Sequence, residues 1–518
     1  MRKKCTRVLA LLLACGMTLG TLAGCGNNKE GSAKDTDTQV VENPGGENGE
    51  AAKDANAEPY TIDFYYINYN SPLKDLEDVQ AAMSDILREK INADIVLHPI
   101  DSGAWSDKVN MMYVSQDKID VICSSAGLSP DYSTSVAKGA FLELEELIQE
   151  YGQGIIDACG WDFISGTTLN GHIYGVPVLK EKGIAYGYIF NKELVEKYEF
   201  DLTTVKSYKD IEPMLQVIKE KEPGVTPLCM SGRDTRSLRN AAHCGDVYSD
   251  MFFVPCDTED FQVIPWYEYE PELELLRWIR EMYEAGYVNK SSLTDTDEGP
   301  MKAGNAFCMP YEMHPGKALE LSSAWGLEVE QVFLCDNYMA STQSLGIMSS
   351  IGRTSRNPER VMQFLNLLYT DKELINLLVF GIEGKDYVKV SDGIITYPEG
   401  VTAESVGYAN QGWLFGNQFN NYLRDTEDPE KWTKYEAFNE EAIISPVLGF
   451  VFDVSKVSVE MAAIDSVNSQ YGMALHTGAI DPEANLEEYV GKLKDAGIEK
   501  VLEECQRQLD EWRAANGK

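Results

Sequence analysis

Segments typical of strands and of helices alternate between residues 60 and 125, and this alternation limits the folds open to the chain. The run TIDFYYINYN at 61–70 is rich in aromatic and β-branched residues, as a buried strand would be. Residues 75–91 repeat apolar side chains at helical spacing. The pattern continues with a predicted strand, a helix and another strand at 93–100, 105–114 and 119–125. Such alternation predicts an α/β domain with a parallel sheet.

Ligands of parallel sheets bind beyond the carboxyl ends of the strands. These ends place six residues on loops that could meet a ligand: Asn68, Tyr69, Asp101, Trp105, Ser124 and Ser125. Their side chains are uncharged or acidic, and GPMKAGN at 299–305 lacks the Lys-Ser/Thr of a nucleotide-binding loop. The sequence therefore predicts no nucleotide cofactor.

Helical patterns return later in the chain. They predict one helix that begins at Asn191 and three others at 208–221, 271–285 and 357–380. They also predict a pair of helices near the C-terminus, interrupted at Ala496 and Gly497. Pro358 suits the first turn of its helix, because the missing N–H has no partner there. The apolar run TQSLGIMSSI at 342–351 predicts a strand.

The N-terminal segment predicts export. Residues 1–24 combine a basic start with an apolar run that is short for a membrane span, as in a signal peptide. The tetrapeptide Leu22-Ala23-Gly24-Cys25 resembles the lipid-attachment site of bacterial lipoproteins, so we expect a lipid on Cys25. Residues 25–58 are polar and acidic, which predicts a flexible linker. The expected location is the extracellular face of the bacterial cell membrane.

Charge and length constrain the body that follows. The formal net charge is −38, and removing the four cations Arg2, Lys3, Lys4 and Arg7 with the signal gives −42. This charge argues against nucleic acid, which needs Lys and Arg to displace counterions, and against a strongly anionic ligand. About 460 residues after residue 59 exceed what one core usually holds, so two lobes are expected.

The cysteines and histidines do not form a recognisable chemical motif. Eight of the 11 cysteines remain beyond Cys25, at irregular spacing, and we expect mostly buried free thiols. No CxxC or HxxxH spacing predicts a metal site, and no GxSxG or HExxH motif predicts a catalytic residue. Paired carboxylates of a glycoside hydrolase leave no such signal, so an extracellular hydrolase stays open as an alternative.

Several motifs together indicate a family. DLEDVQAAMSDILREKINADI, VAKGAFLELEELIQEYG, LNGHIYGVPV followed by YIFNKELVEKY, SRNPERVMQFLNLLYTDKELINLL and FGIEGKDY resemble the extracellular solute-binding proteins of ABC importers, in the maltose-binding-protein-like group. SPVLGFVFDVSKV and the terminal KLKDAGIEKVLEECQRQLDEW are similar to the C-terminal region of Firmicutes lipoproteins of this type. The resemblance covers the chain after residue 59.

The resemblance implies a periplasmic-binding-protein-like fold, with two α/β lobes, a hinge and a ligand cleft between the lobes. The expected hinge crossings are near 182–188, near 338–345 and between 385 and 411. Lobe 1 would take 60–183 and 345–385, and lobe 2 would take 188–340 and 410–518, including a C-terminal helical region at 440–518. The protein would be a monomer without metal or cofactor that hands its ligand to membrane permease subunits.

The aromatic content favours an oligosaccharide ligand. Sugar rings pack their C–H faces on aromatic rings, while their hydroxyls need polar partners. The candidate rings are Tyr66, Tyr69, Trp105, Tyr186, Trp266, Tyr311 and Trp413, and for each the alternative is ordinary packing. The polar candidates are Asn68, Asp101, Ser125 and Asn417.

Among the candidate rings, Trp413 has the best sequence support for contact with a ligand, because QGWLFGNQFNNYL surrounds it with amides. These amides could instead bond within their own loop; they are Gln411, Asn417, Gln418, Asn420 and Asn421. Arg233 and Arg236 could bind a carboxylate, as in an acidic sugar or a peptide C-terminus, or form a solvated loop. A receptor for peptides or other small solutes therefore stays open.

Overall fold

The computed structural model describes residues 58–69, 73–231, 235–243, 245–256, 260–294 and 298–517. Cys25 and Arg233 lie outside the described residues. From Glu58 onward the chain forms one unit by its internal contacts. Within the described ranges, no helix is long and apolar enough to cross a lipid bilayer.

The alternating segments near the start of the body form the predicted parallel sheet. Strand β1 (Tyr60–Asn68) lies between β2 (Ala93–Asp101) and β3 (Val121–Ser124) and is parallel to both. Two later strands complete the sheet in the order β2-β1-β3-β15-β6: β15 (Met348–Ile351) and β6 (Val176–Pro177). Strand β15 is antiparallel to its neighbours.

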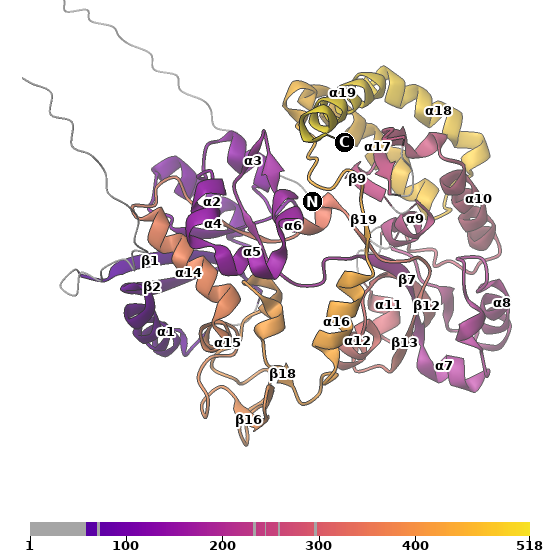
Figure 1. Ribbon diagram of the computed structural model, residues 1–518. Helices are drawn as coiled ribbons and strands as arrows, with labels where there is room; N and C mark the ends of the chain where they lie inside the picture. Colours follow the sequence, from indigo (N-terminus) through magenta and orange to yellow (C-terminus); the bar gives the residue numbers. More distant parts are fainter. Residues whose placement is uncertain are drawn as a thin grey trace, which may run out of the picture. The chain divides into compact units, whose positions relative to one another are not determined.

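Helices and a small hairpin accompany this sheet (Figure 1). They are α1 (Leu76–Ile91), α2 (Trp105–Ser115), α3 (Tyr132–Ala137), α4 (Glu145–Tyr151), α5 (Gln153–Cys159), α6 (Trp161–Ser165), β4 (Thr168–Leu169), β5 (His172–Ile173), α14 (Pro358–Thr370) and α15 (Lys372–Phe380). Their apolar faces bury the first core, in which Phe64 packs edge-on against Phe364 and Phe415.

The helix expected over 357–380 is in fact two helices, α14 and α15. Asp371 separates them, because its side chain accepts hydrogen bonds from the N–H groups of Glu373 and Leu374 and so caps a new helix. Pro358 occupies the first turn of α14, as predicted, behind an N-cap at Asn357.

The strand expected over 342–351 is only half strand. The short helix α13 (Ser341–Ser344) comes first, and β15 begins at Met348. Helix α13 starts where buried Asp246 accepts a hydrogen bond from the backbone N–H of Ser341 at 2.7 Å. The other carboxylate oxygen of Asp246 accepts a hydrogen bond from the hydroxyl of Ser445. One aspartate thus joins three distant segments.

A second sheet follows, in the order β13-β7-β12-β8. Its strands are β7 (Ala185–Asn191), β8 (Thr226–Leu228), β12 (Ala306–Met313) and β13 (Val329–Phe333), with β7 antiparallel to β12 and β13. The associated helices are α7 (Lys192–Lys197), η1 (Leu202–Thr204), α8 (Glu212–Lys221), α9 (Thr235–His243), α10 (Glu270–Glu284), α11 (Gly299–Lys302), α12 (Lys317–Trp325) and α16 (Lys431–Glu440). Asn191 caps α7, so the predicted helix start is confirmed.

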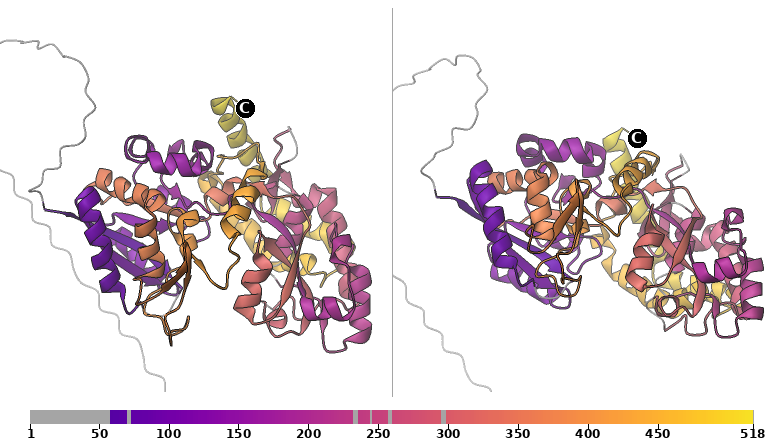
Figure 2. Two further views of the ribbon diagram at one scale, coloured as in Figure 1. Left: turned by 60° about the horizontal axis from the view of Figure 1, so that its bottom comes forward. Right: turned by 90° about the horizontal axis from the view of Figure 1, so that it is seen from below.

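The C-terminal helices pack with a small third sheet, β11-β10-β9. The strands are β9 (Gly245–Ser249), β10 (Phe252–Pro255) and β11 (Ile264–Pro265), followed by η2 (Trp266–Glu268). The helices are η5 (Val454–Lys456), α17 (Ser458–His476), α18 (Pro482–Asp495) and α19 (Ile498–Asn516), drawn in yellow to orange in Figures 1 and 2. The predicted break of the terminal pair at Gly497 is confirmed, and its φ of 96° suits glycine.

Short elements connect these parts. They are β14 (Tyr338–Met339), which pairs with β19 (Ile443–Ile444), the sheet β16 (Val388–Ser391), β17 (Ile394–Thr396) and β18 (Leu423–Arg424), and the turns η3 (Gly412–Leu414) and η4 (Gln418–Asn420). Residues from 410 were expected in lobe 2, yet Leu414 and Phe415 pack in the first core. Aromatic contact explains this position, since the Phe415 ring lies 5.1 Å from Tyr66.

The described cysteines confirm the expectation of mostly buried thiols, since six of the seven are buried and Cys335 is partly exposed. Cys123, Cys159, Cys308 and Cys505 are free and buried. Burial raises the pKa of the Cys123 and Cys159 thiols to about 12, so both are protonated at neutral pH. Cys244 lies outside the described residues.

Candidate functional site

A cavity of about 480 Å³, here named the Arg239 cavity, opens beside the carboxyl end of β3. Its lining comes from four separated stretches of chain: Ala126, Tyr186, Arg236, Arg239, Asn240, Gly245, Val247, Tyr248, Ser249, Asp250, Phe252, Phe253, Tyr338, Thr342 and Gln343. Ala126 follows β3, and α9 follows β8, so two strands of different sheets end near this cavity. This is where α/β sheets bind ligands.

Tyr186, one of the predicted rings, forms part of the wall. Its hydroxyl accepts a hydrogen bond from Asn240 Nδ2 at 2.9 Å, and its ring lies 6.4 Å from that of Tyr338. Burial raises the pKa of Tyr186, so the hydroxyl keeps its proton and can donate it to a ligand oxygen.

Arg239 is held by a buried carboxylate. Its Nε donates to Glu272 Oε1 at 2.6 Å and its Nη2 donates to the Asp250 carbonyl at 3.0 Å. The side chain of Arg239 is 11% exposed and that of Glu272 is 0% exposed, so the pair is largely shielded from water. The carboxylate neutralises the guanidinium, which leaves directional donors rather than a free charge at the cavity.

His476 lies behind this pair. Its Nε2 is 2.9 Å from Glu272 Oε1, and its Nδ1 is 2.7 Å from the Gly472 carbonyl. Burial, together with the charge of Arg239, lowers the pKa of His476. Because the lowered pKa favours a neutral imidazole with a single N–H, one of these two contacts is a hydrogen bond that the ring donates.

A second cavity of about 570 Å³, here named the His314 cavity, is lined by rings, amides and charged groups. The rings are Phe380, Trp413, Tyr422, Trp432 and Tyr435, and the amides are Asn410, Gln411, Gln418 and Asn421. His314 and Lys317 follow β12, while Trp413 lies on η3.

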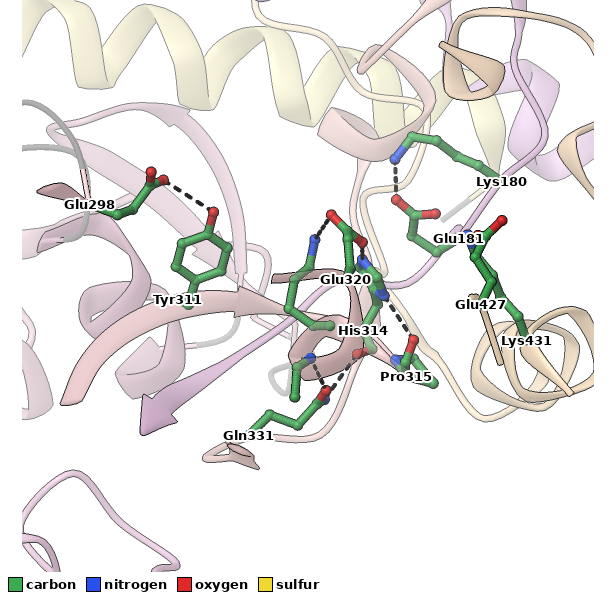
Figure 3. A network of polar contacts seen from close by, with 12 residues as sticks. Lys180, Glu181, Glu298, Tyr311, His314, Pro315, Glu320, Gln331, Glu427 and Lys431 are labelled. Atoms are coloured by element: carbon green, nitrogen blue, oxygen red, sulfur yellow. Dashed lines mark hydrogen bonds and ion pairs between the residues drawn. The ribbon is translucent and has the colours of Figure 1, made fainter. Parts of the chain in front are cut away.

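The charges of the His314 cavity largely pair with one another (Figure 3). Glu320 lies 3.2 Å from His314 Nε2 and 3.1 Å from Lys317 Nζ. Burial alone would raise the pKa of Glu320, but these two partners outweigh it and lower that pKa to about 2. Further pairs are Lys180 with Glu181, Lys431 with Glu427 and Lys434 with Asp428.

The structure brings together two predicted rings at the end of β1. Tyr69 and Trp413 lie 5.8 Å apart and are 49% and 37% exposed. Strand β1 is the neighbour of β3, so Tyr69 and Ala126 follow adjacent strands. Trp413 and the Arg239 cavity therefore border the same edge of the first sheet.

Three predicted polar residues lie at this edge but support its turns. Asn68 and Asp101 are partners in the β1–β2 register, and Asp101 accepts a hydrogen bond from the Gly103 N–H at 2.9 Å. Ser125 is buried; its hydroxyl donates to the Gly346 carbonyl at 2.7 Å and accepts from the Gly127 N–H.

Three other predicted rings are core side chains and line neither cavity. Tyr66 and Trp105 are buried in the first core, and Trp266 is buried in the third. The hydroxyl of Tyr66 accepts a hydrogen bond from Asn410, and burial raises its pKa to about 12. These three rings therefore pack in hydrophobic cores, which was the alternative to contact with a ligand.

Tyr311 and Asn417 also lie outside the lining of both cavities. The Tyr311 hydroxyl donates to Glu298 at 3.2 Å. Asn417 caps η4 by accepting from the Phe419 N–H, and its amide donates to the Tyr369 carbonyl at 3.5 Å. Some amides near Trp413 thus bond to neighbouring backbone, while Gln411, Gln418 and Asn421 line the His314 cavity.

Sequence reasoning missed most of the Arg239 cavity. It named Tyr186 and Arg236, but not Arg239, Asn240, Tyr248, Tyr338 or Gln343. One signal was present, because Arg239 and Asn240 follow Arg236 by three and four positions on one helix and so share its face.

Comparison with known proteins decides the family. A family model described as "Domain of unknown function (DUF3502)" matches residues 446–514. A protein of Streptococcus pneumoniae serotype 4, described as a carbohydrate ABC transporter substrate-binding protein, is 30% identical over 475 residues, which span 90% of this chain and 93% of that protein. This chain belongs to the carbohydrate ABC transporter substrate-binding proteins.

Solved structures agree with this assignment for our substrate-binding protein. The crystal structure of the N-glycan transport solute binding protein (NgtS) from Streptococcus pneumoniae matches with a TM-score of 0.76 and 28% identity, over 87% of this chain and 98% of that one. NgtS in complex with Man5GlcNAc matches with a TM-score of 0.66 and 28% identity, over 88% and 98%. The two-lobe solute-binding-protein fold and the family predicted from the motifs are confirmed.

Proposed function

We propose that the protein captures a neutral oligosaccharide in the Arg239 cavity and delivers it to the permease subunits of an ABC importer. The observation that carries this proposal is the lining of that cavity, which combines aromatic rings with the donors of Arg239, Asn240 and Tyr186. Rings take the C–H faces of a sugar, and fixed donors take its oxygens.

A longer sugar would extend from the cavity toward Trp413. The path runs past the ends of β3 and β1, where Asn68, Tyr69 and Ser125 lie. Its far end is the Tyr69–Trp413 pair, which is exposed enough to receive a sugar face. The structure of NgtS with Man5GlcNAc supports a ligand of several sugar units.

The proposed mechanism is capture without chemistry. Lobes that follow roughly the boundaries expected from the sequence would close over a ligand that contacts both, because the ligand favours the closed state by its differential affinity. The linker at residues 180–182 has contacts that suit a hinge, since Asn439 donates to the Lys180 carbonyl at 3.1 Å and accepts from the Lys182 N–H at 2.6 Å. Relatives of this family are substrate-binding proteins rather than enzymes.

Calorimetric titration of the protein with Man5GlcNAc and with a mannose–GlcNAc disaccharide tests the function and its site. We expect both to bind. Trp413→Ala should lower the affinity for Man5GlcNAc about tenfold, which corresponds to ~1.4 kcal/mol of binding free energy. The affinity of this variant for the disaccharide should fall by less than about twofold, because the disaccharide fills the Arg239 cavity without reaching Trp413.

Trp161→Ala is the matched control, because Trp161 is 38% exposed and lines neither cavity. It should leave both affinities unchanged. If no neutral saccharide binds while peptides or amino acids do, the carbohydrate proposal is wrong. If Trp413→Ala lowered the affinity for both sugars equally, the proposed path of the longer sugar toward Trp413 would be refuted.

We also propose that Cys25 carries the lipid that holds the protein at the extracellular face of the membrane. The short apolar run and the small residues before Cys25 support this assignment. Cys25→Ala should release most of the protein into the medium of a Gram-positive host, as measured by fractionation and immunoblotting, and should abolish labelling with a radioactive fatty acid.

Cys15→Ala is the control for this experiment, since Cys15 lies inside the apolar run and should leave anchoring unchanged. Retention of the Cys25→Ala protein in the membrane fraction with full fatty-acid labelling would exclude Cys25 as the attachment site.

A further inference from the structure

We propose that the C-terminal segment 446–514, which matches the domain of unknown function, positions one wall of the Arg239 cavity and thereby sets its affinity for sugars. This inference rests on the proposed function of that cavity. The wall residues concerned are Arg239, Tyr248 and Phe252, which line the cavity from α9, β9 and β10.

Two of the three wall residues pack directly on rings of the segment. Phe450 meets Tyr248 edge-on, with ring centroids 5.1 Å apart and an angle of 74°. Phe452 meets Phe252 in the same manner at 5.9 Å. Phe450 and Phe452 are buried, so the positions of these four rings depend on one another.

The third wall residue, Arg239, is reached through Glu272. His476, on α17, lies 2.9 Å from the same Glu272 oxygen that accepts from Arg239 Nε at 2.6 Å. The second ring nitrogen of His476 is held by the Gly472 carbonyl. His476 therefore fixes where Glu272 can sit, and Glu272 fixes the guanidinium of Arg239.

Trp266 fills the space behind this chain of contacts. Its ring lies 5.8 Å from the Arg239 guanidinium, 5.0 Å from the His476 ring and 5.8 Å from the Tyr489 ring of α18. The indole thus transmits the packing of α17 and α18 to Arg239. Its role is to position Arg239, which agrees with its burial in the third core.

The small third sheet explains why such backing is needed. It has three strands of two to five residues each, which is too little to hold a rigid wall by itself. Residues of 446–514 pack against this sheet and add a second layer to it. The segment acts as the rigid support of the binding wall without touching the ligand.

Three variants and titration with the mannose–GlcNAc disaccharide test this inference. His476→Gln and Phe450→Leu should each lower the affinity for the disaccharide at least fivefold. Val501→Ala is the control, because Val501 is buried in the same core on α19 and lines neither cavity. It should lower the thermal midpoint while leaving the affinity within about twofold, which separates positioning from general destabilisation.

Amide hydrogen exchange of the ligand-free proteins provides a second readout that needs no sugar. Exchange in β9 and β10 (residues 245–255) should rise in Phe450→Leu and not in Val501→Ala. The inference is overturned if His476→Gln and Phe450→Leu bind like the parent, or if β9 and β10 exchange equally in all variants. A parent protein that binds no saccharide would instead refute the proposed function.

Discussion

Glu272→Gln is expected to destabilise the protein by about 3 kcal/mol, because it removes the counter-charge of a largely buried guanidinium. Glu272 lies on α10 with no exposed surface, and its Oε1 receives Arg239 and faces His476. Glutamine keeps the shape and one acceptor but not the charge. Urea denaturation followed by tryptophan fluorescence measures the loss.

Glu281→Gln provides the matched control, since the same substitution then occurs on the same helix at an exposed position. It should change stability by less than about 0.5 kcal/mol. If both variants unfold at the same urea concentration, the Glu272 contact contributes nothing beyond a surface carboxylate and the account of Arg239 is wrong.

Gly187→Ala is expected to cost about 3 kcal/mol through overpacking in the second sheet. Gly187 lies in β7, which has a strand on each side. An added Cβ would overlap the Val332 carbonyl oxygen and lie 3.0 Å from the Phe333 Cα, both in β13. Backbone atoms cannot turn aside as side chains do, so β13 would have to move. Thermal unfolding should report a clearly lower midpoint.

Gly224→Ala tests whether this loss comes from the contact rather than from the change of residue. A Cβ at Gly224 meets nothing within 4 Å, so this variant should unfold like the parent. Equal midpoints for Gly187→Ala and the parent would show that β13 yields at little cost.

The sequence predicted the elements of the fold better than their ends. The alternation between residues 60 and 125 is a local signal, because spacing alone distinguishes the strands around Phe64 from helix α1. The break at Asp371 needed a side chain to cap a new helix in the middle of an unbroken apolar pattern. Helix α13 depends on a contact with Asp246, about 95 residues away, which no local pattern contains.

The candidate site was harder to predict, since its lining is drawn from four stretches of chain. Tyr186 and Trp413 were named because rings stand near polar residues there, but the same reasoning named Trp266, which packing buries completely. Nothing local separates a ring that lines a cavity from one that fills a core. The contact between Tyr69 and Trp413 joins residues more than 340 positions apart, so only the folded chain shows it.

The carboxylate of Asp246 has a mechanical consequence. It belongs to β9, which carries part of the cavity wall, and it holds the backbone of Ser341 and the hydroxyl of Ser445 on two segments close to the paired strands β14 and β19. Strand β9 is therefore tied directly to both segments. If the Arg239 cavity takes the sugar as we propose, a ligand that displaces β9 would also displace the segments of Ser341 and Ser445, because the same buried carboxylate holds all three.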